Sequence, residues 1–118
     1  MFLIKCFEGR LGALGAYYRV TLYTSSDGLC RELLARASGV RGVGEGLALV
    51  EEVLAEHGGC RVVSEDPLIL ETGDASVRVV AEPDSPLATM MHSRLVARVR
   101  ERCSAKDTPL NGPGASPP

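Results

Sequence analysis

The fold of this chain is decided by residues 84–103, which read DSPLATMMHSRLVARVRERC. Asp84 and Ser85 are good capping residues for the start of a helix, and Pro86 suits its first turn. Apolar residues then recur at the spacing of one helical face. They are Met91, Leu95, Val99 and Cys103. The pattern predicts a long helix that packs against the rest of the domain.

This helix carries a histidine in its apolar arc and an excess of positive charge beside it. His92 falls among the apolar positions, and Glu101 is the only acidic residue between the arginines. The arginines are Arg94, Arg98, Arg100 and Arg102. Such a mixed surface suits a partner, although cations in the last turns of a helix are also stabilised by its dipole.

Upstream of this helix, five strands and two further helices are expected. Alternating or apolar runs bounded by turn residues predict strands over 1–7, 16–24, 60–64, 68–72 and 76–82. One helix is expected to begin at one of three candidate capping residues, Ser25, Ser26 or Asp27, and to end at Ser38 and Gly39. A second is expected over 45–57, and glycine-rich loops over 9–15 and 39–46. In the second helix, Leu47, Val50, Val53 and Leu54 are expected to be buried, with the glutamates opposite.

The order of these elements predicts an α+β fold. We expect two layers, a mostly antiparallel sheet of four to five strands with three helices packed on one face. Residues 1–103 form a single domain, and residues 104–118 are a Pro-, Gly- and Ser-rich tail that is too polar to pack alone.

The composition limits what kind of protein this chain can be. The chain has 118 residues, 45% hydrophobic and 24% charged, with a net charge of −2. These values are typical of one small globular domain and give no overall electrostatic footprint for nucleic acid. Lys5 and Glu8 interrupt the first apolar run too early for a signal peptide, and no run is long enough to cross a membrane. We therefore expect a cytoplasmic protein.

The cysteines and the amide-poor composition are less specific. Cys6, Cys30, Cys60 and Cys103 form no CxxC pair, so we expect buried thiols and no metal site. Eleven arginines, two lysines and no glutamine favour a thermophilic source, although a GC-rich genome gives a similar bias.

Two candidate sites remain, with no cofactor signature in either. One is a small-ligand or catalytic pocket built from Arg41, Gly42, Gly44 and His92, because a glycine loop before a helix can bind an anion. No phosphate-loop fingerprint fits the loop, and Glu45 would oppose an anion. His92 is better explained as a packed or interface residue than as a catalytic one.

The other candidate is a protein-binding surface. It comprises Met90, Met91, Arg94, Leu95, Arg98 and Val99 on the last helix, with Tyr17 and Tyr23 on the second strand. An RNA-binding module is a further alternative, which requires a continuous positive stripe from Arg94 to Lys106.

Two segments resemble a known family. YYRVTLYTSSDGLCRELLARA, residues 17–37, and SVRVVAEPDSPLATMMHSRLVARV, residues 76–99, are similar to the small dimerising subunit of the KEOPS complex, which makes the threonylcarbamoyl modification of tRNA. Asp84, Leu87, Ser93 and Leu95 match the family pattern, whereas His92 replaces its usual asparagine. The first strand and residues 39–59 depart from the family outline.

The resemblance implies a non-catalytic subunit that pairs with a copy or paralogue of itself, docks on a catalytic subunit and assists tRNA binding. The sequence therefore predicts a non-enzymatic interaction subunit, either a homodimer or part of a heteromeric tRNA-modifying complex.

Overall fold

The structure is a computed structural model that describes the backbone of residues 2–107, and the side chains of residues 2–103 apart from Val43. Its centre is a five-stranded antiparallel sheet with the strand order β1-β2-β5-β4-β3. The strands are β1 (Ile4–Ala13), β2 (Ala16–Thr24), β3 (Cys60–Glu65), β4 (Leu68–Thr72) and β5 (Val77–Pro83). The helices are α1 (Asp27–Ala37), α2 (Val43–Glu56) and α3 (Pro86–Asp107).

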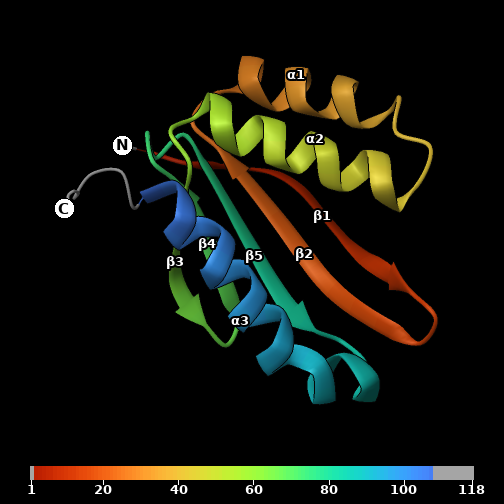
Figure 1. Ribbon diagram of the computed structural model, residues 1–118. Helices are drawn as coiled ribbons and strands as arrows, with labels where there is room; N and C mark the ends of the chain where they lie inside the picture. The colour runs from red at the N-terminus through yellow and green to blue at the C-terminus, as the bar shows by residue number, and fades with distance from the viewer. Residues whose placement is uncertain (1, 108–118) are drawn as a thin grey trace, which may run out of the picture.

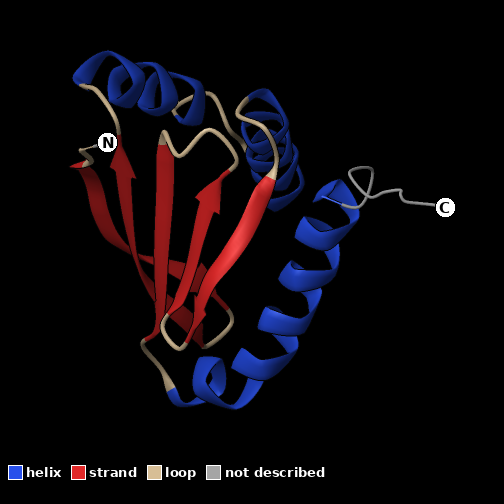
Figure 2. Ribbon diagram, turned by 90° about the vertical axis from the view of Figure 1, so that its left-hand side faces the viewer, coloured by secondary structure: helices blue, strands red, loops and turns tan. Residues whose placement is uncertain are grey.

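The predicted α+β class is confirmed. Helix α3 crosses one face of the sheet and contacts β3, β2 and β5, and α1 packs against the ends of β1 and β2 (Figure 1). Helix α2 lies beside α1. In the described part of the chain, no helix covers the opposite face of the sheet (Figure 2). We call these two faces the helix side and the helix-free side.

Strand β2 behaves as its alternation predicts. Its register with β5 pairs Val20 with Ala81 and Leu22 with Val79. The hydroxyl of Tyr18, on the same face of the strand, reaches α3. The alternate residues of β2, which include Tyr17 and Tyr23, therefore point to the helix-free side.

The first strand is longer than predicted. Strand β1 continues through Gly9 and Gly12, where we expected a loop, and the turn to β2 consists of Leu14 and Gly15 alone. Both turn residues have positive φ, 56° and 87°, as a tight hairpin turn requires. Met1, at the start of the predicted strand, lies outside the described residues.

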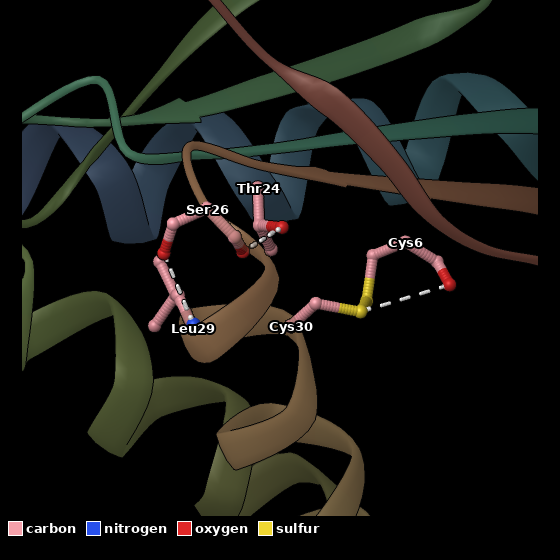
Figure 3. Close-up of a disulfide and its surroundings, with 5 residues drawn as sticks. All are labelled: Cys6, Thr24, Ser26, Leu29 and Cys30. Carbon is pink, nitrogen blue, oxygen red and sulfur yellow. Dashed lines mark hydrogen bonds between the residues drawn. A yellow bond between two sulfur atoms is a disulfide. The ribbon is translucent and has the colours of Figure 1, made fainter.

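Helix α1 begins where its capping residue predicts. The hydroxyl of Ser26 accepts a hydrogen bond from the N–H of Leu29, and Thr24 bonds the carbonyl of Ser26 (Figure 3). This cap satisfies one of the free N–H groups of the first turn.

Two predictions about the second half of the chain need correction. Helix α2 begins at Val43, so Gly44 and Gly46 are helical rather than part of a loop. Helix α3 continues to Asp107, which places the start of the predicted tail within the helix; residues 108–118 lie outside the described part.

The expectation of free buried thiols is wrong, because all four cysteines form disulfides. Cys6 on β1 bonds Cys30 on α1 (Figure 3), and Cys60 on β3 bonds Cys103 on α3. Each bridge joins a helix to the strand at one edge of the sheet. The two disulfides fasten α1 and α3 to the sheet, at places where few large apolar side chains pack between helix and strand.

The hydrophobic core is small. Its buried members are Leu33, Cys60, Leu68, Val77, Ala88, Val96 and Cys103. Among the fully buried side chains the largest are those of Thr24 and Thr72, which are polar. None of the helices within residues 2–107 is long and apolar enough to cross a bilayer.

Candidate functional site

A groove of about 630 Å³ lies between α3 and the start of β2. Ala16 and Tyr18 line the groove from β2, and Ala88 lines it from α3. The remaining lining residues all come from α3: Met91, Arg94, Leu95, Ala97, Arg98 and Glu101. Four of the predicted partner-binding residues, Met91, Arg94, Leu95 and Arg98, are thus brought together in one apolar groove with a charged rim.

His92 fixes α3 above the sheet on the side of this groove. Its Nδ1 lies 3.1 Å from the Tyr18 hydroxyl, and its Nε2 lies 2.6 Å from the carbonyl oxygen of Glu65. The ring therefore donates from Nε2 and accepts the Tyr18 proton at Nδ1. Burial raises the pKa of Tyr18, which keeps its hydroxyl protonated as a donor. Both ring nitrogens are engaged in holding the helix, as expected for a packed histidine.

Exposed apolar side chains also occur on β1 and on α3. Phe7 and Leu11 on β1 lie opposite Leu22 and Tyr18, so they belong to the helix side, yet both are exposed. On α3, Met90 is 77% exposed, and Leu87 and Met91 are also exposed. Figure 1 shows no helix across the hairpin half of β1 and β2. The helix layer is incomplete there.

The predicted apolar face of α2 is only partly covered. Val53 and Leu54 are half-buried, as expected of that face. Leu47 and Val50, which we also expected to be buried, are 62% and 52% exposed. Glu52 and Glu56 are exposed, as predicted, and they pair with Arg36 of α1 at 2.7 and 2.9 Å.

Two of the four arginines of α3 are neutralised within the chain. Arg100 pairs with Glu65 at 2.6 Å, and Arg102 pairs with Glu51. Arg94 and Arg98 have no ion-pair partner within residues 2–103. The positive stripe expected of an RNA-binding module is therefore interrupted, and the side chain of Lys106 lies outside the described part.

Tyr17 and Tyr23 do not join this surface, because both lie on the helix-free side. The guanidinium of Arg10 stacks over the ring of Tyr17, 4.2 Å from its centroid. Tyr23 lines a shallow hollow of about 310 Å³ together with Ile69 and Val80. The structure separates the two tyrosines from the predicted residues of α3.

The residues of the alternative ligand site also lie apart. Arg41 and Gly42 lie in the connection from α1 to α2, which Figure 1 shows well away from α3, the helix that carries His92. The N–H of Arg41 donates to the Glu45 carboxylate, which places a negative charge at the start of α2. An anion at this helix terminus would be repelled.

A cluster of His57, Asp74 and Ser76 was not predicted, because His57 is distant in sequence from the other two. The Asp74 carboxylate lies 2.9 Å from His57 Nδ1, and Ser76 Oγ lies 3.0 Å from the same nitrogen. Burial opposes ionisation of Asp74, but hydrogen bonds from Ser76, His57 and Thr72 outweigh it and hold its pKa well below the usual range. Since serine and aspartate reach the same ring nitrogen, this is not the arrangement of a catalytic triad. The cluster fastens the end of α2 to the β4–β5 turn.

A buried carboxylate lies on the helix-free side. Glu71 on β4 accepts hydrogen bonds from Arg61 and Arg78 on the neighbouring strands, and these bonds lower its pKa. The three charges form a ladder across β3, β4 and β5. This face of the sheet is therefore polar where the helix side is apolar.

Within the side chains that the structure describes, no group of three or more His, Cys, Asp or Glu residues is arranged to hold a metal ion. Compared with known proteins, the chain matches no family model, no curated protein and no solved structure. Functional interpretation accordingly depends on the surfaces described above.

Proposed function

We propose that this protein is a non-catalytic, self-associating interaction subunit. The observation that carries the proposal is the incomplete helix layer, where Phe7 and Leu11 of β1 are exposed on the side of the sheet that also carries the α3 groove. Contiguous exposed apolar surface on a small domain is typical of a protein interface. The small core supports this interpretation, because a second chain would cover surface that this one cannot bury itself.

We further propose a tRNA-modifying assembly as its setting. This step depends on the resemblance of residues 17–37 and 76–99 to the small dimerising subunit of the KEOPS complex. In the fold, these segments form a pair of strand-to-helix units, β2 with α1 and β5 with α3, and the two strands are neighbours. The unpaired Arg94 and Arg98 would then contact a larger partner or tRNA at the rim of the groove.

The decisive experiment places a carboxylate in the groove. Leu95→Asp should weaken self-association at least about 100-fold, because a buried unpaired charge is costly at an interface. Light scattering after size exclusion should report the mass of a dimer for the native chain and of a monomer for the variant.

Two further variants make the result interpretable. Met91→Asp alters an exposed groove residue and should act in the same direction without disturbing the fold. Val63→Asp places the same charge at an exposed apolar residue of β3 and should leave the dimer intact. A native chain that remains monomeric at high concentration, or a dimer that tolerates both groove variants, would contradict the proposal.

A further inference from the structure

The outer edge of β1 is open. β1 pairs with β2 on one side, and no described strand lies on its other side. From Phe7 to Ala13 every residue except Gly9 is exposed. Such an edge presents unpaired backbone N–H and C=O groups, which readily pair with another strand.

The hairpin turn determines which residues face outward. In a hairpin closed by a two-residue turn, the flanking residues, here Ala13 and Ala16, form a hydrogen-bonded pair, and such pairs alternate along the strands. Backbone groups of Phe7, Gly9 and Leu11 therefore face β2. Those of Glu8 and Arg10 face the open edge.

We propose that a second copy of this chain binds here by antiparallel pairing of β1 with β1, in a register centred on Gly9. In that register Phe7 lies opposite Leu11 of the other copy on the helix side. Glu8 lies opposite Arg10 of the other copy on the helix-free side. Each pair occurs twice because the arrangement is two-fold symmetric.

Charge selects this register over its neighbours. A shift of two residues in one direction places Glu8 opposite a second Glu8, and a shift in the other places Arg10 opposite a second Arg10. Opposite charges directly across an antiparallel pair are stabilising and like charges are destabilising. The strand is therefore self-complementary in one register only among these three.

Glu8 and Arg10 already form ion pairs within the chain, but these pairs are exposed and can be replaced by pairs to the second copy. Glu8 pairs with Lys5 at 3.0 Å and Arg10 with Asp84 at 2.8 Å, and all four side chains are solvent-accessible. Exposed ion pairs contribute only ~0–1 kcal/mol, so replacing or sharing them costs little.

This inference rests on the proposed self-association and names its geometry. Pairing of the two edges would join two five-stranded sheets into one and place Phe7 and Leu11 of both copies in contact. The disulfide from Cys6 to Cys30 holds β1 against α1, so the edge is already ordered before the second copy binds (Figure 3).

Charge reversal tests the register. Glu8→Arg and Arg10→Glu should each weaken dimerisation about 10-fold, since each creates two like-charge pairs. The double variant exchanges the charges and should restore most of the affinity. Arg41→Glu, a charge reversal in the exposed α1–α2 connection, is the matched control and should have no effect.

Cross-linking provides a second measurement. Gly9→Cys places two thiols across the proposed two-fold axis, and mild oxidation by molecular oxygen should join them into a covalent dimer. The new side chain meets only the tip of the Phe7 ring, which can rotate away. Ala13 lies four residues from the axis, so the two thiols of Ala13→Cys are far apart and should not cross-link.

The outcomes separate the two levels of the proposal. A monomeric native chain overturns both the proposed function and this inference. A dimer that depends on Leu95 but tolerates both single charge reversals, and does not cross-link through Gly9→Cys, overturns the β1 pairing and leaves the proposed function in place.

Discussion

The two edges of the sheet are built differently. Strand β3 has six residues, its pairing is interrupted between Val62 and Ser64, and α3 packs against it. Strand β1 has ten residues, its register shift lies near its start between Lys5 and Phe7, and the rest of the strand carries exposed apolar side chains on the helix side. A short, irregular and covered edge resists further strand pairing, whereas a long exposed one invites it. The contrast indicates which side of the molecule is closed by its own chain and which is left for a partner.

The largest effect on stability is expected from removing the disulfide that fastens α3 to β3. Replacing Cys60 and Cys103 with alanine should lower the free energy of unfolding by about 4 kcal/mol, from the loop entropy of a bridge that spans 43 residues. The matched pair, Cys6 and Cys30, spans 24 residues and should cost about 3 kcal/mol. Urea unfolding measures both. A loss below about 1 kcal/mol for either pair would contradict a structural role for that bridge.

A smaller effect is expected at the β4–β5 turn on the closed side. Asp74→Ala removes the acceptor for Ser76, His57 and Thr72 and should cost about 1 kcal/mol at neutral pH, because the carboxylate is partly exposed. Since the pKa of Asp74 is depressed in the fold, its contribution is full above the unfolded value of about 4 and is lost as pH falls below it.

The pH dependence supplies the check on that residue. Thermal unfolding followed from neutral to acidic pH should show a shallower decline for Asp74→Ala than for the native chain. Glu82→Ala, which removes an exposed carboxylate of β5, should leave the decline unchanged. Identical profiles for the native chain and Asp74→Ala would show that the cluster contributes nothing to acid sensitivity.

The smallest effect on stability is expected from removing an ion pair at the β3 edge. Arg100→Ala removes the exposed ion pair with Glu65 that lies between α3 and the end of β3. The loss should be no more than about 0.5 kcal/mol and should diminish in high salt. A larger loss, measured by urea unfolding, would mean that ion pairs rather than the disulfide hold α3 over this edge.

Elements with a local signal were predicted well. The cap at Ser26 and the alternation of β2 depend on residues close in sequence, and both are confirmed. The end of β1 was missed because glycine is usually a loop signal. Gly12 has a φ of 148°, and a Cβ there would lie 2.1 Å from the carbonyl oxygen of Ala16. This glycine serves close packing within the hairpin.

Long-range pairing was beyond the sequence patterns. The amphipathic period of α2 predicts an apolar face but not how much of it the domain covers: Val53 is half-buried, whereas Leu47 and Val50 are exposed. The partners of the cysteines and the bond between Tyr18 and His92 likewise depend on tertiary packing. In the candidate site, the grouping of α3 residues followed from their helical spacing, whereas the separation of Tyr17 and Tyr23 required the sheet.

The two disulfides enclose successive, non-overlapping segments of the chain, residues 6–30 and 60–103. Each covalent loop can close without threading through the other. Helix α2, at residues 43–56, lies in the interval between them and is the only one of the three described helices that neither bridge fastens. Its opening leaves both crosslinked loops intact, so α2 is the segment that can detach at the lowest cost while the sheet persists.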